Sequence, residues 1–230
     1  MTERRHRLSL LCALALLAAP QTLSAAELDG GVSVTSRYVY RGIDMSDGEP
    51  AVQGRIEVGL GGLYAGVWAS SVASDYDDRS AEVDVFAGYQ RRLHPALALD
   101  ATVVRYTYQG GGVGSRYDWT EGQLTAHLRD HWSLTAGLAR DWYGFDADTW
   151  SLEGSWHYAP GPRWLLDATL GHNAIGDAVG FDYQWAEVGL TRQLGPLHAR
   201  VGYSATTGAA AFGDLTRDRW ILSLGWDPGR

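Results

Sequence analysis

The chain has 230 residues, a formal net charge of −8 and a single cysteine. Its acidic balance argues against nucleic-acid binding, which needs a basic surface, and one cysteine excludes a disulfide framework. No run of about 18 apolar residues follows residue 26, which excludes a membrane-spanning helix in that part of the chain.

The first 26 residues have the pattern of a secretory signal peptide. A basic head at residues 4–7 precedes an apolar run at residues 8–19, and residues 24–26 are small enough for cleavage. The apolar run is short for a stable spanning helix, although an uncleaved anchor helix is the alternative. We therefore expect a signal peptide at residues 1–26 and one domain at residues 27–230. That domain has 16 arginines, no lysine, 26 acidic residues and a net charge of −10.

The clearest structural pattern is the alternation over residues 51–72. Val52, Ile56 and Val58 share one face of the first arm, and polar residues occupy the other face. Gly61-Gly62 separates this arm from a second alternating arm and can supply the positive φ angles of a two-residue hairpin turn. Each arm has about ten residues, which is the length of a tilted strand that crosses a bilayer.

The same alternation recurs along the chain and predicts twelve strands. Short turns alternate with longer links, except for a short link at residues 144–147 that breaks the trend. An even strand number with this alternation is typical of an outer-membrane β-barrel whose termini are both periplasmic. The strands are expected at residues 31–40, 51–60, 63–72, 81–91, 96–108, 117–128, 132–143, 148–158, 163–172, 182–193, 197–206 and 218–226.

An all-β, transmembrane, antiparallel barrel is favoured over a soluble secreted β-sandwich, which also has one apolar and one polar face per strand. The strands are longer than those of most soluble sheets, and aromatic residues such as Trp150 and Trp220 lie near strand ends. Charged residues occur at mid-strand on the polar face, where a lumen would hydrate them. The residues expected to line the lumen are Arg55, Glu57, Glu82, Asp84, Glu121, Glu153, Glu187 and Arg200.

Residues 36–54 read Ser-Arg-Tyr-Val-Tyr-Arg-Gly-Ile-Asp-Met-Ser-Asp-Gly-Glu-Pro-Ala-Val-Gln-Gly. This stretch resembles the opening motif of the TorF family of porins, found in proteobacteria. Residues 62–70, 82–89, 106–108 and 185–190 also look like that family's pattern. The resemblance covers essentially the whole chain after residue 26 and implies a bacterial outer-membrane barrel. It implies little about the substrate.

The link at residues 41–50 carries a distinctive motif formed by Arg41, Gly42, Ser46 and Pro50. Its Arg-Gly and Ser-Asp-Gly sequences are typical of turns. One interpretation is a segment folded into the mouth or lumen, with Arg41 against wall acids such as Glu57 or Glu82. The other interpretation is a structured turn that fixes the first hairpin.

The polar face predicts a porin, a passive diffusion channel for small hydrophilic solutes or ions with a weak preference for cations, because acids outnumber arginines there. The alternative is a non-conducting structural or surface-recognition barrel, with a lumen filled by Glu–Arg pairs, Trp68, Tyr106 and Phe86. The expected partners are outer-membrane lipid and lipopolysaccharide, the barrel assembly machinery, the solutes or ions and, in a homo-oligomer, further copies of this chain. No cofactor is expected.

An outer-membrane hydrolase is a weaker alternative. Glu153, Ser155 and His157 share one strand face, but their spacing of two is the strand alternation itself. No nucleophile-elbow or metal-binding spacing appears. The acidic residues Asp75, Asp77 and Asp78 lack a full calcium-loop pattern, so no metal site is expected.

Overall fold

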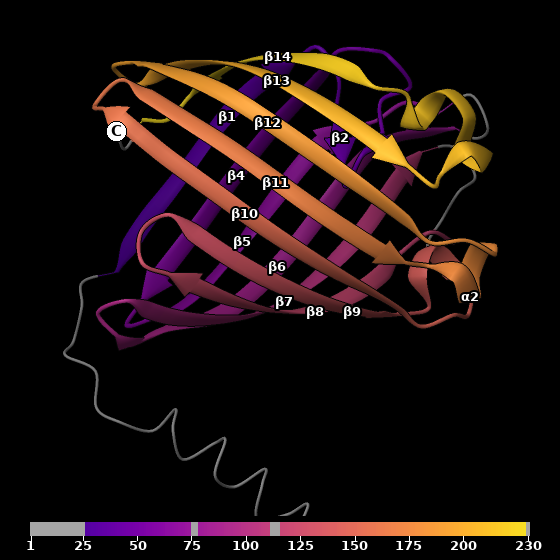
Figure 1. The fold of residues 1–230 in the computed structure, drawn as a ribbon, viewed down its shortest axis with the longest axis horizontal. Helices are drawn as coiled ribbons and strands as arrows, with labels where there is room; N and C mark the ends of the chain where they lie inside the picture. The colour runs from indigo at the N-terminus through magenta and orange to yellow at the C-terminus, as the bar shows by residue number, and fades with distance from the viewer. Residues whose placement is uncertain (1–25, 75–77, 111–115, 229–230) are drawn as a thin grey trace, which may run out of the picture.

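Twelve strands close into an antiparallel barrel in a computed structural model that describes residues 26–74, 78–110 and 116–228. This architecture confirms the fold class predicted from the sequence. The barrel strands are inclined to the long axis of the molecule, with the short helix α2 (Gly176–Val179) at one end and the C-terminus at the other (Figure 1). None of the helices in the described ranges is both long and apolar enough to cross a bilayer. The expected signal peptide lies outside the described residues, apart from its last residue.

The barrel strands have between 8 and 16 residues. Short turns follow β4, β6, β8, β10 and β12, and longer links follow the other strands up to β13, so the two kinds of connection lie at opposite ends. The barrel strands are β1 (Glu27–Thr35), β4 (Ala51–Leu60), β5 (Leu63–Ser71), β6 (Arg79–His94), β7 (Leu97–Gly110), β8 (Trp119–Leu128), β9 (Trp132–Arg140), β10 (Thr149–Gly161), β11 (Trp164–Ala174), β12 (Tyr183–Leu194), β13 (Leu197–Thr207) and β14 (Arg219–Trp226).

Closure of the barrel depends on β1, which pairs with β14 on one side and β4 on the other. Val32 lies opposite Trp226, and Glu27 lies opposite Gly59. A closed sheet leaves no strand edge with unpaired backbone groups, so the barrel cannot add further strands at an edge.

The first strand differs from its predicted range of residues 31–40. β1 ends at Thr35, and the chain then turns into the barrel as a small hairpin, β2 (Val39–Tyr40) and β3 (Ile43–Asp44). The physical reason is that alternation fails after Thr35, because Tyr38, Val39 and Tyr40 are consecutive and leave no polar face. We call residues 36–50 the inward segment.

The link between β9 and β10 also differs from the prediction. It covers residues 141–148 and contains the short helix η1 (Trp142–Gly144), so it is long like the other links at its end of the barrel. Strand β9 stops early because Asp141, Tyr143 and Asp146 all have positive φ, which a strand cannot accommodate. The longer links therefore alternate with short turns without exception.

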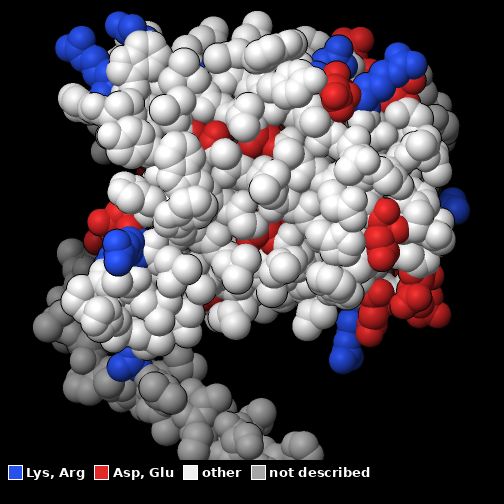
Figure 2. Space-filling model, viewed as in Figure 1, with Lys and Arg blue, Asp and Glu red and all other residues white. Residues whose placement is uncertain are grey.

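The outer face of the barrel is apolar. On the face in Figure 2, Arg, Asp and Glu gather toward the two ends and leave a broad band of mainly uncharged residues between them. Exposed aromatic residues lie on this surface near both ends of the barrel. Trp150 and Trp220 lie near the long-link end, and Trp132 and Trp226 lie near the short-turn end. An apolar belt with aromatic girdles is the arrangement of transmembrane barrels.

Candidate functional site

The eight charged residues predicted to line the lumen all lie on the face of their strands opposite the exposed apolar side chains. On β4, for example, Arg55 and Glu57 alternate with Ile56 and Val58, which are largely exposed. The structure brings some of these eight residues together in clusters and separates others. Their role in a solute path stays a prediction.

The inward segment forms its own hairpin inside the barrel. Val39 pairs with Asp44 and Tyr40 pairs with Ile43, and the two turn residues Arg41 and Gly42 have φ values of 47° and 78°. Positive φ at both central positions is the geometry of a type I′ hairpin turn. A side chain at Gly42 would come within 2.7 Å of Trp185 Cβ, so the close approach to the wall also requires glycine.

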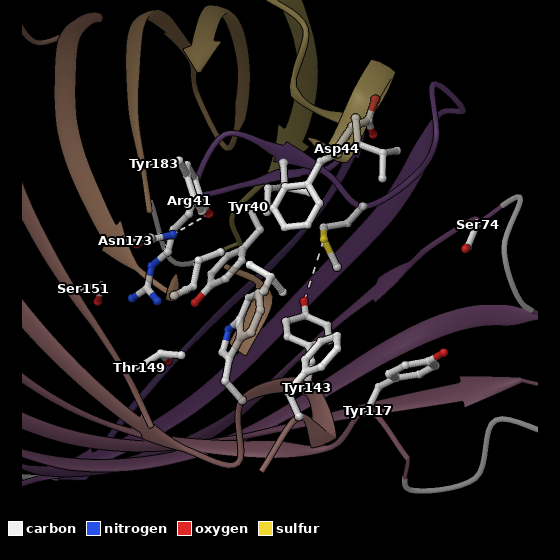
Figure 3. Close-up of a pocket in the computed structure, with 18 of the residues that line it drawn as sticks. Tyr40, Arg41, Asp44, Ser74, Tyr117, Tyr143, Thr149, Ser151, Asn173 and Tyr183 are labelled. Carbon is white, nitrogen blue, oxygen red and sulfur yellow. Dashed lines mark hydrogen bonds between the residues drawn. The ribbon is translucent and has the colours of Figure 1, made fainter. Parts of the chain in front are cut away.

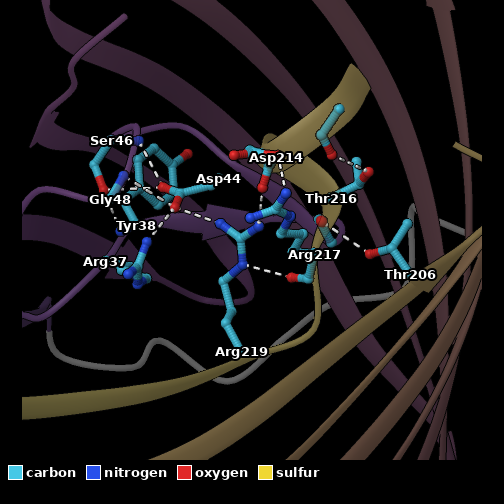
Figure 4. Close-up of polar contacts among 12 residues, drawn as sticks. Arg37, Tyr38, Asp44, Ser46, Gly48, Thr206, Asp214, Thr216, Arg217 and Arg219 are labelled. Atoms are coloured by element: carbon cyan, nitrogen blue, oxygen red, sulfur yellow. Dashed lines mark hydrogen bonds and ion pairs between the residues drawn. The ribbon is translucent and has the colours of Figure 1, made fainter. Parts of the chain in front are cut away.

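Asp44 anchors the inward segment to the wall and to itself. Its Oδ1 accepts hydrogen bonds from Ser46 N at 3.0 Å and from Ser46 Oγ at 3.1 Å, and its Oδ2 accepts one from Gly48 N at 3.1 Å. Two arginines pair with the same carboxylate: Arg37 at 3.2 Å and Arg219, which reaches in from β14 (Figure 4). A buried carboxylate needs such partners, because an unpaired charge in the interior is costly.

Ser46 has a second role, since its Oγ accepts a hydrogen bond from Tyr38 N at 2.9 Å. The motif residues Gly42 and Ser46 therefore both shape the inward hairpin. Pro50 lies exposed at the end of the segment, directly before Ala51, which begins β4 and is fully buried. The two interpretations of residues 41–50 therefore both apply: the segment folds into the lumen, and it does so as a structured turn.

Arg41 lies at the tip of the inward hairpin and contacts the far wall of the barrel. Its Nη1 and Nη2 donate to the two carboxylate oxygens of Glu121 at 2.9 and 3.2 Å, and its Nε donates to Glu153 at 2.7 Å. The side chains of Arg41 and Glu121 are 8% and 2% exposed. We call these three residues the Arg41 cluster. Arg41 thus lies against wall acids, but they are not Glu57 or Glu82, the two examples expected from the sequence. Those two acids lie on β4 and β6, whereas the inward hairpin directs Arg41 to β8 and β10.

The Arg41 cluster spans the lumen. The inward segment enters the lumen between β1 and β4. Glu121 and Glu153 belong to β8 and β10, which lie about halfway around the strand order from β1 and β4. The cluster therefore joins opposite walls. Bidentate Arg–carboxylate pairs are strong and geometrically specific, so this contact fixes the position of the hairpin tip.

Aromatic side chains of the barrel wall contact the inward segment. The Tyr106 ring stacks on Trp119 at 4.0 Å between centroids, and the Tyr40 and Tyr106 hydroxyls are 3.1 Å apart. Tyr38 packs against Trp68 at 5.1 Å between ring centroids. Trp68 and Tyr106, two residues expected to fill a closed lumen, thus narrow the interior together with the segment.

Glu82 and Asp84 lie next to each other on the inner face of β6. They are 1% and 7% exposed. The Tyr108 hydroxyl donates to Glu82 Oε1 at 3.0 Å. Glu82 Oε2 and Asp84 Oδ1 accept no hydrogen bond from the described residues. Two neighbouring acids therefore leave unsatisfied acceptor atoms on this part of the inner wall.

The remaining predicted wall residues form ion pairs nearer the short-turn end. Arg200 pairs with Glu187 at 2.7 Å and with Asp167 at 2.6 Å, all partly exposed. Arg55 pairs with Glu57 at 3.4 Å and also contacts Asp29. These pairs join residues of the same or nearby strands and keep the wall polar at this end. Unlike the Arg41 cluster, they do not cross the lumen.

A cavity of about 430 Å³ lies at the long-link end, above the Arg41 cluster (Figure 3). We call it the mouth cavity. The Tyr143 side chain in η1 contributes its hydroxyl to the lining, 3.9 Å from the Met45 sulfur. Burial raises the pKa of this hydroxyl, so it stays protonated. The lining includes Tyr40, Arg41, Met45, Trp142, Tyr143, Phe145, Asn173, Ile175, Val179, Tyr183, Ala211 and Phe212.

The residues weighed for catalysis do not hydrogen-bond to one another. Ser155 Oγ bonds to Thr169 Oγ1 at 3.0 Å, Glu153 pairs with Arg41, and the His157 ring packs near that of His131. Among the described residues, no group of three or more His, Cys, Asp or Glu is placed to hold a metal ion. The acidic stretch at residues 75–78 lies mostly outside the described ranges.

Sequence reasoning missed three charged residues of the interior. Asp167 lies between Leu166 and Ala168, and Arg219 alternates with the exposed Trp220, so the period-two rule that found Glu187 also predicts both inward positions. Asp44 precedes Ser46 by two residues, a spacing at which an Asp side chain commonly caps a turn.

Two solved structures similar to this chain are described as a porin and as an outer membrane channel. A KdgM porin has a TM-score of 0.57 and 10% identity, with 88% of this chain and 98% of that chain covered. An outer membrane channel from Pseudomonas putida F1 has a TM-score of 0.54 and 13% identity, with 91% and 98% covered. At these identities the likeness shows the fold alone.

Sequence comparison gives the family. No curated protein matches this chain. The profile of the family described as "Bacterial protein of unknown function (Gcw_chp)" matches residues 18–224, which is most of the chain. The chain therefore belongs to the Gcw_chp family of bacterial proteins.

Proposed function

We propose that this protein is a porin of the bacterial outer membrane that passes small hydrophilic solutes or ions by passive diffusion, with a weak preference for cations. The closed barrel with its apolar outer belt supports a membrane location. The likeness of residues 36–54 to the TorF porin motif supports the same assignment. The apolar belt would contact outer-membrane lipid and lipopolysaccharide after insertion by the barrel assembly machinery, and the short-turn end would face the periplasm.

The observation that carries the cation preference is the pair Glu82 and Asp84. Each has a carboxylate oxygen on the inner wall that no described residue satisfies. Acidic side chains on a channel wall attract cations and repel anions, as acidic rings do in cation channels. The wall pairs at Arg200 and Arg55 are also each made with two acids, which adds to the negative balance.

The Arg41 cluster makes the proposed path narrow. An arginine that joins opposite walls divides the lumen, and the aromatic rings of Tyr106 and Trp119 fill part of the remaining space. Twelve strands enclose less space than the sixteen of open porins. We therefore expect small unitary conductance and a low size limit for solutes.

The test is the reversal potential of the refolded protein in a planar bilayer under a potassium chloride gradient. The wild type should give a potential of the sign for cation selectivity, and the double variant Glu82→Gln/Asp84→Asn should move it toward zero. Asp130→Asn, in a short turn, is the matched control and should leave the potential unchanged. A double variant that keeps the wild-type potential would contradict the role given to these two acids.

A non-conducting barrel is the second candidate function. It is favoured by the same contacts of Arg41 with Glu121 and Glu153, which close part of the lumen in the structure. In that case the folded wild type would insert into the bilayer and carry no current. The two candidates therefore give opposite results in one measurement.

A further inference from the structure

We propose that the mouth cavity binds a small neutral molecule with a ring-shaped apolar body and one hydrogen-bond donor. Its volume of about 430 Å³ lies within the range of small-molecule sites, which is about 300–1,000 Å³. Such sites are mainly apolar and have a few fixed polar groups that orient the ligand. The mouth cavity has both features.

Apolar walls come from separate parts of the chain. Trp142 and Phe145 belong to the β9–β10 link, Val179 belongs to α2, and Phe212 belongs to the short helix η2 (Ala210–Thr216). The inward segment supplies Met45 from below. Flat aromatic faces favour a ligand with a ring that can stack on them.

Asn173 contributes to the lining a polar atom that no described residue satisfies. Asn173 is 5% exposed, and its Oδ1 accepts no hydrogen bond from the described residues. The side chain is held in place because its Nδ2 donates to the Tyr183 hydroxyl, as the dashed line in Figure 3 shows. A buried acceptor left unsatisfied is costly. A ligand O–H or N–H donor would satisfy it.

The charges that reach the mouth cavity already have partners. Arg41 is paired with Glu121 and Glu153. Arg79 lies over the Tyr117 ring at 4.9 Å, and Asp47 also has a partner.

Asp44, the remaining charged residue of the lining, is paired with Arg37 and Arg219. A charged ligand would therefore have to break an existing pair, and burying a charge without a new partner is costly. These pairings favour a neutral ligand over an ion.

This inference goes beyond the proposed channel function and does not depend on it. The mouth cavity lies at the long-link end, so a ligand can reach it whether or not the lumen conducts. A silent barrel can still bind, and a conducting barrel can fail to bind. A failed binding test would therefore leave the proposed channel function intact, and a failed conductance test would leave the proposed ligand site intact.

The test uses indole and 1-methylindole as probes, with the protein in lipid nanodiscs and empty nanodiscs as the blank. Indole has an N–H donor, and 1-methylindole has the same rings without it. Isothermal titration should show saturable binding of indole that empty nanodiscs lack. The affinity for 1-methylindole should be lower by about five-fold, the value of one hydrogen bond. No saturable binding of either probe, or equal affinity for both, would overturn the proposal.

Two variants locate the binding. Asn173→Leu should remove the difference between the two probes, because it removes the acceptor. Ala211→Trp places a large ring in the cavity lining and should abolish binding of both probes. Ala210→Trp adds the same ring one residue away, outside that lining, and should bind as the wild type does. Undiminished binding in Ala211→Trp would place the probes elsewhere and overturn the proposal, even if Asn173→Leu fails to fold.

Discussion

Arg41 joins two walls of the barrel that the strand order places far apart. Its guanidinium makes three hydrogen bonds, two to Glu121 and one to Glu153. Removing the side chain breaks the contact between the hairpin tip and the far wall, and leaves two acids without their cation. We therefore expect Arg41→Ala to increase both unitary conductance and cation selectivity in a planar bilayer.

Two further variants make this prediction specific. Arg41→Lys keeps the charge but cannot form the paired bonds to one carboxylate, so its conductance should lie between those of the wild type and Arg41→Ala. Arg55→Ala removes an arginine with a 44% exposed side chain near the short-turn end and should change conductance less. Current steps in Arg41→Ala that equal those of the wild type would show that Arg41 does not limit the path.

At the residue scale, the sequence predicts which side chains face inward but not which of them meet. Period two along β8 and β10 is enough to place Glu121 and Glu153 on the inner face. Their contact with Arg41 depends on how a distant segment crosses the lumen, and no local pattern contains that information. For the same reason the sequence predicts the wrong acids as the partners of Arg41.

At the scale of elements, the inward hairpin depends on Gly42. Both Gly42 and Gly180 have positive φ, 78° and 88°, so an alanine at either position is strained by about 1–3 kcal/mol. Only at Gly42 would the new side chain also meet the wall, at Trp185. We expect Gly42→Ala to displace the inward segment while the barrel stays closed.

Limited trypsin digestion of proteoliposomes checks this outcome. Fragments cut after Arg37 or Arg41 should appear faster in Gly42→Ala than in the wild type, with an unchanged far-ultraviolet circular dichroism spectrum. Gly180→Ala carries the same kind of backbone strain with no atom within 4 Å of the added carbon, and should digest like the wild type. Equal protection of all three proteins would mean that the wall tolerates a side chain at residue 42.

The outer face of β4 gives a prediction about the membrane. Ile56 at mid-strand and Leu60 at the short-turn end are 56% and 55% exposed. In a bilayer, arginine at mid-depth costs about 2–4 kcal/mol and near the interface about 0–1 kcal/mol. Urea unfolding in lipid vesicles should therefore show a much larger loss of stability for Ile56→Arg than for Leu60→Arg. Equal, small losses would indicate that this face meets water.

The strands could be predicted because each carries its own alternation, whereas the inward segment could not be placed by the same rule. The turn at Gly61-Gly62 and the arms on either side agree between sequence and structure. Beyond Thr35 the alternation stops, and the path of the chain is set by contacts of Asp44 with Arg219 on β14. Such contacts join residues that are far apart in sequence, so they appear only in the folded chain.

On the scale of the whole molecule, three features act together. The apolar belt suits a bilayer, the inner wall carries excess acid, and the inward segment divides the interior between the mouth cavity and the short-turn end. A barrel built only for rigidity would gain more from apolar packing than from the buried acids Glu82 and Asp84, because unsatisfied carboxylates are costly in an interior. These two acids are the basis of the cation preference that we propose, which stays a prediction.

The most direct test is single-channel recording of the refolded wild-type protein in a planar bilayer with a potassium chloride gradient. The structure predicts discrete current steps of small size, with a reversal potential of the sign for cation selectivity. Folded protein that inserts without carrying current would contradict the channel, and steps with anion selectivity would contradict the role of the acidic wall.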